Sequence, residues 1–116
     1  MRKIVINIDF GGFGLSHEAM LRYAEIKGIK LISVERDNSL IPYDYYTDEI
    51  GEDNYFFDND ISRDDPALVQ AVEELGGKAN GRFSSLKVCE IPEDVNWHIV
   101  EYDGLEHVAE EHRTWR

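Results

Sequence analysis

Cysteine is almost absent from this sequence, with Cys89 as its single occurrence. An internal disulfide is therefore excluded, and the apolar neighbours of Cys89 predict a core thiol in a reducing compartment. Long hydrophobic runs are also missing, because Asn7 and Asp9 interrupt the apolar stretch near the N-terminus. That stretch is too short for a signal peptide or a membrane span. Together these absences predict a cytoplasmic protein without membrane contact.

Basic residues are scarce. Twelve Lys and Arg stand against 24 Asp and Glu, which gives a net charge of −12. The excess is concentrated between Glu35 and Asp65, a stretch with eleven acidic and two basic residues. Such a surface repels the phosphates of DNA and RNA, so we expect no direct nucleic-acid binding. It suits a basic protein partner, a cation, or solubility alone.

The N-terminal third has an alternation of strand and helix signals. The length predicts one domain, 1–116, of mixed α/β class. A nearly continuous apolar run predicts a strand at Lys3–Phe10 that is covered on both faces. Ser16 and Gly28 are typical of the two ends of a helix, and a second strand is predicted at Ile29–Glu35. Strand, helix and strand in about thirty residues predict a right-handed crossover between parallel strands.

A second helix is marked at both ends. Asp65 is a typical N-cap, Pro66 suits the first helical position, and Gly76 marks the C-terminus. A third strand is predicted at Leu86–Ile91 before the next proline.

The tail allows two structures. Asp103-Gly104 favours a two-residue turn in a β-hairpin that completes a mixed sheet. The predicted register pairs Tyr102 with Leu105, Val100 with His107 and Ile99 with Val108. The alternative is a helix through 105–113, opened by a capping box of Asp103 and Glu106.

An acidic, aromatic-rich insertion is predicted at about 36–64. It contains six aromatic residues: Tyr43, Tyr45, Tyr46, Tyr55, Phe56 and Phe57. A structureless loop of this length is uncommon in a compact domain, so we expect short elements, among them an edge strand at Tyr55–Phe57. Its rings and carboxylates suit either a basic protein surface or the covering of a sheet edge.

The stretch DFGGFG (9–14) joins the first strand to the first helix. A strand, glycines and a helix N-terminus form the layout that presents backbone N–H groups to a phosphate. The stretch matches neither G-x-G-x-x-G nor G-x-x-x-x-G-K-S/T, so the alternative is a tight corner with Phe10 and Phe13 on the core. Asn7 and Asp9, at the end of the strand, would border an anion or nucleotide site here.

Arg63 is one of two basic residues in the acidic insertion. We expect it either to help bind a phosphate or carboxylate, or to form an internal ion pair with Asp60 or Asp64. The surrounding DNDISRDD is similar to a calcium loop only superficially, since Arg63 and Val69 stand where that loop needs glycine and glutamate. No metal site is predicted there.

The tail concentrates ionisable groups: His98, His107, His112, Glu101, Glu106 and Glu110. On a hairpin, Glu101 and Glu106 would oppose each other, as a carboxylate pair for acid–base chemistry would. Two histidines and a carboxylate also suit a metal, and a solvated face is the simplest alternative. No Ser or Cys stands in a nucleophile context, so an enzyme is not favoured.

Three blocks of the sequence resemble a family of small proteins from tailed bacteriophages and prophages. They are KIVINIDFGGFGLSHEA, SRDDPALVQAVEELG and IPEDVNWHIVEYDGLEHVAEEHRTW, which cover nearly the whole chain but leave out 37–54. The resemblance implies a phage origin and an accessory role directed at the host, without a particular activity. It singles out the matching positions Gly11, Gly12, Gly14, Ser16, Arg63, Asp65, Glu101, Asp103, Glu106, His112 and Arg113.

We therefore expect a non-enzymatic phage accessory protein that binds a small phosphorylated or nucleotide-like ligand in the host cytoplasm. The predicted ligand-binding residues are Asn7, Gly11, Gly12, Gly14, Ser16, Arg63, Glu101, Glu106 and Arg113, with no metal and no cofactor. One alternative is an acidic inhibitor that mimics nucleic acid on a host protein. Another is a small nucleotide-acting enzyme that uses the tail carboxylates. A homo-oligomer formed through a bare strand edge is also compatible with the sequence.

Overall fold

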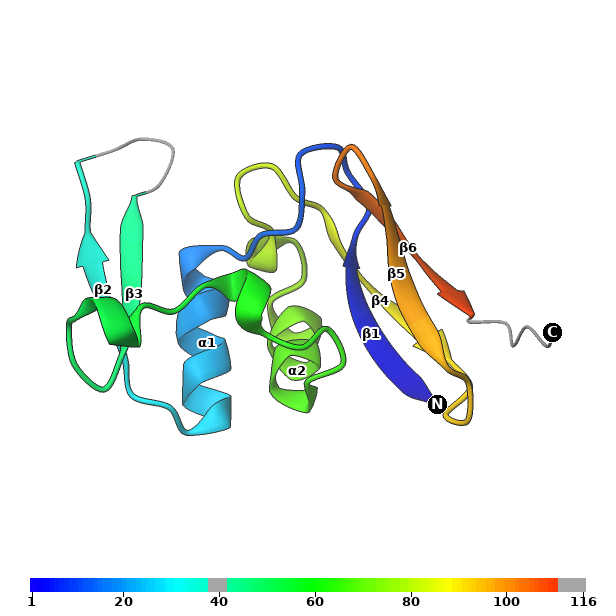
Figure 1. Ribbon diagram of the computed structural model, residues 1–116, viewed down its shortest axis with the longest axis horizontal. Coiled ribbons are helices and arrows are strands. Elements are labelled where there is room, and N and C mark those ends of the chain that lie inside the picture. The colour runs from blue at the N-terminus through cyan, green and yellow to red at the C-terminus, as the bar shows by residue number, and fades with distance from the viewer. Residues whose placement is uncertain (38–41, 111–116) are drawn as a thin grey trace, which may run out of the picture.

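The computed structural model describes residues 1–37 and 42–110. Within these ranges the chain forms two α-helices and three two-stranded antiparallel sheets, which pair β1 with β4, β2 with β3 and β5 with β6 (Figure 1). The mixed α/β class is thereby confirmed. The elements are β1 (Arg2–Asn7), α1 (His17–Lys27), β2 (Leu31–Glu35), β3 (Tyr43–Thr47), α2 (Pro66–Leu75), β4 (Leu86–Ile91), β5 (Trp97–Tyr102) and β6 (Leu105–Glu110).

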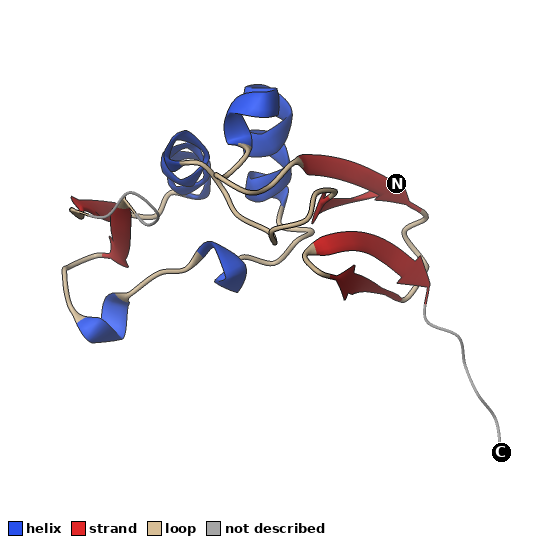
Figure 2. Cartoon of the chain, turned by 90° about the horizontal axis from the view of Figure 1, so that it is seen from above, coloured by secondary structure: helices blue, strands red, loops and turns tan. Residues whose placement is uncertain are grey.

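The molecule is elongated, with extents of 52 × 31 × 28 Å. The two helices lie in the middle, with the β2–β3 ribbon at one end and the other two sheets at the opposite end (Figures 1 and 2). The connection from β3 to α2 carries two short 3-10 turns, Glu52–Asn54 and Asp58–Asp60, and a third, Gly76–Ala79, follows α2.

Both helices are capped as the sequence predicts. The Ser16 hydroxyl accepts a hydrogen bond from the Ala19 N–H, and Gly28 ends α1 in the left-handed conformation. The Asp65 carboxylate accepts from the Ala67 N–H at the start of α2, whose first residue is proline. The predicted strand at Leu86–Ile91 is confirmed with the same bounds.

The predicted parallel pairing is wrong. β1 ends at Asn7 and runs antiparallel to β4, while β2 begins at Leu31 and pairs with β3 instead. The second edge of β1 is occupied by other groups, because the Val5 N–H donates to the Arg63 carbonyl and the Asn7 N–H to the Glu106 carboxylate. The apolar run correctly indicates burial for residues 4–7, which contact α2 and β6, whereas Ile8 and Phe10 at the end of the predicted strand are exposed.

The tail forms a hairpin, and the described residues through Glu110 exclude the helix there. All three predicted residue pairs are confirmed, from Tyr102 opposite Leu105 to Ile99 opposite Val108. Asp103 and Gly104 both adopt positive φ, as a tight two-residue turn requires. The hairpin does not join β1 in a common ladder, so its expected place in one mixed sheet is wrong.

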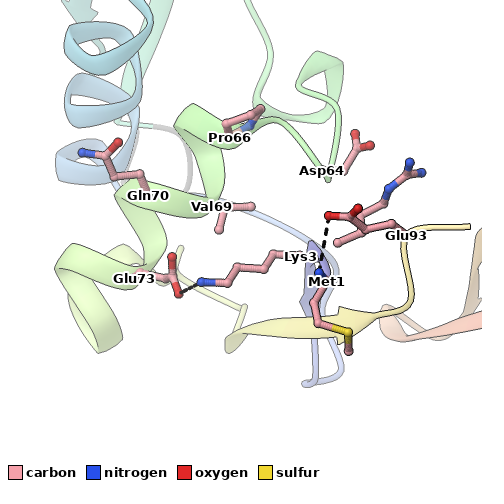
Figure 3. Close-up of a pocket in the computed structure, with 9 residues that line it drawn as sticks. Met1, Lys3, Asp64, Pro66, Val69, Gln70, Glu73 and Glu93 are labelled. Carbon is pink, nitrogen blue, oxygen red and sulfur yellow. Dashed lines mark hydrogen bonds and ion pairs between the residues drawn. The ribbon is translucent and has the colours of Figure 1, made fainter.

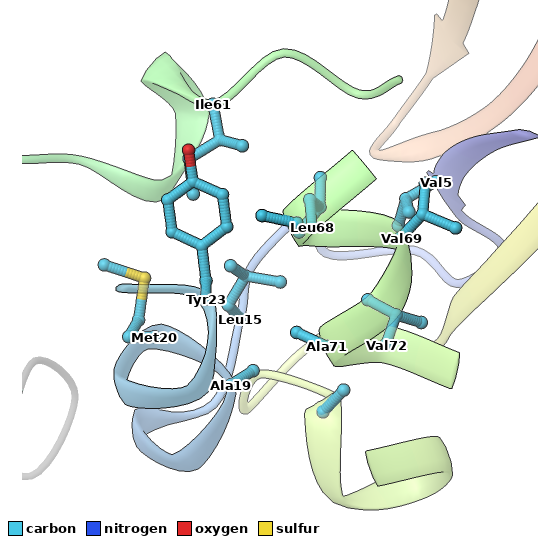
Figure 4. Packing of buried hydrophobic residues seen from close by; sticks show 12 residues of the cluster. Val5, Leu15, Ala19, Met20, Tyr23, Ile61, Leu68, Val69, Ala71 and Val72 are labelled. Atoms are coloured by element: carbon cyan, nitrogen blue, oxygen red, sulfur yellow. The ribbon is translucent and has the colours of Figure 1, made fainter. Parts of the chain in front are cut away.

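The core lies between the two helices and β1 (Figure 4). Tyr23 of α1 and Leu68 of α2 lie in the middle of this buried cluster, which Met20 extends on the α1 side and Val72 and Val5 on the side of β1. The one cysteine, expected in the core, is only half-buried on β4.

The acidic insertion contains a strand that the sequence did not suggest. β3 pairs with β2 across its whole length, whereas the expected strand at Tyr55–Phe57 is reduced to one bridge between Tyr55 and Tyr46. Phe56 packs against the core cluster and stacks on Tyr23, with ring centroids 6.3 Å apart. One ring of the insertion, Phe56, therefore covers the core, whereas the neighbouring Phe57 is exposed to solvent.

Candidate functional site

Arg63 and Glu106 form a largely buried ion pair that ties the hairpin to β1. Two guanidinium nitrogens of Arg63 donate to the two carboxylate oxygens of Glu106, at 2.6 and 2.9 Å. The side chains are only 16% and 7% exposed, and the Asn7 N–H donates to the same carboxylate at 2.8 Å. The guanidinium also stacks on the Phe13 ring, 3.6 Å from its centroid. The internal ion pair expected for Arg63 thus exists, but its partner is neither Asp60 nor Asp64.

The side chain of Asn7 joins three segments of the chain. Its amide nitrogen donates to the carbonyls of Asp9 and Gly104, both at 2.7 Å. Its oxygen accepts from the N–H groups of Asp9 and Ser85, at 3.2 and 2.9 Å. Asn7 is completely buried, so its polar atoms are all used within the protein.

The glycine loop is a tight corner that receives the tip of the hairpin. Gly11 and Gly12 have φ values of 137° and 94°, a region that favours glycine. The Gly11 N–H donates to the Asp103 carbonyl at 3.3 Å. A Cβ on Gly104 would collide with the backbone nitrogens of Gly11 and Gly12, so only glycine allows this approach.

The start of α1 is occupied by groups of the chain itself. The Leu15 N–H donates to the Asp58 carboxylate at 3.0 Å, in the region where the sequence predicted an anion. The Ser16 N–H donates to the Ala79 carbonyl, and the Ser16 hydroxyl donates to the Lys78 carbonyl at 2.6 Å. The Gly14 carbonyl accepts from Ser84 and Gly81.

The predicted ligand-binding residues therefore fall into two groups. Asn7, Gly11, Gly12, Arg63 and Glu106 come together at the junction of β1 and the hairpin, whereas Gly14 and Ser16 lie at the start of α1. Glu101 is exposed and accepts from the Gly104 N–H at 2.9 Å. It lies opposite Glu106 in the ladder, but each carboxylate binds a different group. Arg113 and His112 lie outside the described residues.

A cleft of about 550 Å³ opens beside α1, and we call it the aromatic cleft. It is bounded by α1, β3 and the segments around 55–58 and 80–82; the lining is Leu15, Ser16, His17, Met20, Pro42, Tyr43, Tyr45, Tyr55, Phe56, Phe57, Asp58, Asn80, Gly81 and Arg82. Volumes of about 300–1,000 Å³ with apolar walls and a few polar groups are typical of small-molecule sites.

One wall of the aromatic cleft is a stack of rings. His17 lies parallel to Tyr43, with centroids 3.8 Å apart and 7° between the planes. Its Nδ1 shares a hydrogen bond of 2.8 Å with the Tyr45 hydroxyl. Burial, with contributions from the nearby Tyr43 and Asp58, raises the pKa of Tyr45 to about 12. The Tyr45 hydroxyl therefore stays protonated at neutral pH.

The polar groups of the aromatic cleft come from separate segments. Asp58 follows the aromatic run, Ser16 caps α1, and Arg82 is an exposed cation on the loop before β4. Four residues that line this cleft were not among the predicted site residues: His17, Tyr43, Asp58 and Arg82. One signal was present, because the rings at positions 43 and 45 alternate with Asp44, as side chains on one face of a strand do.

A second cavity, of about 700 Å³, lies between β1 and α2 (Figure 3). Charged groups that line it bind one another: Lys3 donates to Glu73 at 2.9 Å, and the Met1 amino group lies 3.4 Å from Glu93. None of the described residues that line it is aromatic. The aromatic cleft is therefore the better candidate site, although it is smaller.

Within residues 1–37 and 42–110, no group of three or more His, Cys, Asp and Glu side chains is placed to hold a metal ion. None of the helices in the same ranges is long and apolar enough to cross a membrane. Comparison with protein-family models, characterised proteins and solved structures gives no match, so the site is judged on its own geometry.

Proposed function

We propose that this protein binds a small nucleotide-like ligand in the aromatic cleft and releases it unchanged. The observation that supports the proposal is the combination of flat aromatic walls with a few polar groups in a cleft of ligand size. Nucleobases stack on aromatic side chains, and each stacked base contributes about 1–3 kcal/mol. The Tyr45 hydroxyl and the Asp58 carboxylate are in position to hydrogen-bond the edge of a base or a ribose.

The phosphate of such a ligand needs a positive group, because the chain as a whole carries −12. In the proposal Arg82 supplies this charge, and it lines the same cleft as Ser16 at the start of α1. The Leu15 N–H is already bonded to Asp58, so the phosphate would lie toward Arg82 and not on the glycine loop. Ligand binding at the glycine loop and Arg63, which the sequence predicted, is a different location for the ligand and stays a prediction.

In the proposal His17 forms part of the aromatic wall on which the base stacks. Its ring is stacked on Tyr43 and its Nδ1 is engaged by Tyr45, so it is held in one orientation. With the resemblance to phage proteins, the proposal is that ligand capture in the host cytoplasm lowers the free concentration of a host nucleotide.

The experiment is native mass spectrometry and isothermal titration calorimetry with a panel of nucleoside monophosphates, cyclic nucleotides and the matching nucleosides. Tyr43→Ser removes one stacking ring and should weaken binding by about 5- to 150-fold, from the stacking energy above. Tyr102→Ser is the matched control, because its ring is exposed at the hairpin tip, outside the cleft.

The phosphate is tested separately. Arg82→Ala should weaken the binding of nucleotides several-fold and leave the binding of nucleosides unchanged. Lys87 is an exposed cation on β4, and Lys87→Ala should change neither affinity. No adduct with any member of the panel would contradict the proposal, as would undiminished binding in Tyr43→Ser.

A further inference from the structure

Four large apolar side chains are exposed where three loops meet, and we call them the junction patch. They are Ile8 (47% exposed), Phe10 (61%), Phe83 (56%) and Tyr102 (72%). Ile8 and Phe10 follow β1, Phe83 precedes β4, and Tyr102 ends β5. None of the four lines the aromatic cleft.

The three loops are fixed against one another by backbone contacts. The Ile8 N–H donates to the Ser85 carbonyl at 2.8 Å, and the Gly11 N–H donates to the Asp103 carbonyl at 3.3 Å. Gly11 lies so close to Phe83 that an added Cβ would be 2.7 Å from the Phe83 Cβ. Figures 1 and 2 both show these loops together at one end of the β1–β4 and β5–β6 sheets. The backbone positions that carry the four exposed side chains therefore lie side by side.

This arrangement is typical of a prepared interface. Burying solvent-exposed aromatic rings against a partner stabilises the complex, and such rings contribute much of the binding free energy of protein interfaces. Because the loops are already held by hydrogen bonds, little backbone entropy is lost on binding.

The charges around the junction patch indicate the partner. Asp9, Glu101 and Asp103 are exposed within one residue of its members, against one cation, Arg82, at the same sequence separation among residues 1–37 and 42–110. A second copy of this chain, nucleic acid and an anionic membrane would each meet like charge. We propose that the junction patch binds a basic protein segment that inserts an aliphatic or aromatic anchor between Phe10, Phe83 and Tyr102.

The test selects binders from a phage-displayed library of random 12-residue peptides on the immobilised protein, and then measures the Kd of the enriched peptides by calorimetry. Enriched peptides should carry Lys or Arg together with an aromatic or aliphatic residue. Their Kd should rise by about 30-fold or more in Phe10→Ser/Phe83→Ser/Tyr102→Ser, since truncating interface anchors typically has effects of this size. Leu21→Ser/Ile50→Ser is the matched control, because it removes exposed apolar side chains elsewhere, and should leave the Kd unchanged.

Near-UV circular dichroism checks that each variant is folded, and Phe83→Ala alone replaces the triple variant if that one unfolds. Three results would overturn the proposal: no enrichment of basic peptides, equal weakening in the control variant, or equal binding by the wild type and the folded patch variant. Dimerisation of the wild type that is lost in the patch variant would assign the surface to a second copy instead. Binding to phosphatidylcholine vesicles that is lost in the same variant would assign it to a lipid surface.

Discussion

Replacing Glu106 by Gln should destabilise the protein far more than the same change at Glu101, its neighbour across the ladder. Glu106 accepts two hydrogen bonds from Arg63 and one from the Asn7 N–H, and it is 8% exposed. Glutamine keeps the volume but removes the charge, and turns its amide group toward a guanidinium that is only 16% exposed. Breaking one side of a buried ion pair costs about 3–5 kcal/mol. Because Arg63 retains some solvent contact, we expect a loss near the lower limit of that range.

Glu101→Gln is the control. Glu101 is exposed, and glutamine keeps an oxygen that can accept the hydrogen bond from the Gly104 N–H, so this replacement should cost about 0.5 kcal/mol or less. Urea unfolding followed by tryptophan fluorescence gives the free energy of unfolding of each variant. The reasoning would be refuted if Glu106→Gln lay within about 1 kcal/mol of the wild type, or if the two variants were equally stable.

Three further predictions concern stability and ionisation. Gly104→Ala should lower the free energy of unfolding by more than the roughly 1–2 kcal/mol of left-handed strain, because the new Cβ would collide with the glycine-loop backbone. Gly28 has a similar φ but open space around it, so Gly28→Ala should show the strain alone. Equal losses in urea unfolding would contradict this prediction. A hydrogen bond from Arg22 holds the pKa of Glu74 at about 2, so its contribution to stability is present above pH 4.5 and is lost as the pH falls through about 2. Arg22→Gln should move this pKa toward 4.5 in an NMR carboxyl titration, and an unchanged value would refute the assignment. Tyr23→Phe should cost about 1.5–3 kcal/mol in urea unfolding, because the Tyr23 hydroxyl donates to the N-cap carboxylate of α2, and no measurable loss would contradict that role.

The elements that the sequence predicts correctly are those governed by local chemistry. Ser16 and Gly28 bound α1, Asp65 and Pro66 begin α2, and Asp103-Gly104 sets the hairpin register, each through interactions within a few residues. Such signals depend little on the rest of the chain.

The sheet topology could not be derived in the same way. The apolar run of β1 reports burial on two faces, and either a parallel sheet or a sandwich between a helix and a hairpin satisfies it. Which of the two forms depends on what occupies the edge of β1. Arg63 binds Val5 there from 58 residues away, and Glu106 binds Asn7 from 99 residues away. The strand β3 was missed because the alternation of Tyr43, Asp44 and Tyr45 is short and is broken by a further ring at Tyr46.

The candidate site was predicted only in part, for the same reason. Sequence reasoning found the polar residues at the junction and expected an ion pair for Arg63, but the true partner is 43 residues away. The aromatic cleft combines His17, Tyr43, Asp58 and Arg82 from four segments that no local pattern connects.

The most direct test of the account is a ¹H–¹⁵N NMR titration of the uniformly labelled protein with the tightest-binding nucleotide of the panel. The account predicts that the largest shift changes fall on the backbone amides of His17, Tyr43, Tyr45, Asp58 and Arg82, around the aromatic cleft. Changes confined to the glycine loop and Arg63, or no changes with any nucleotide, would contradict it.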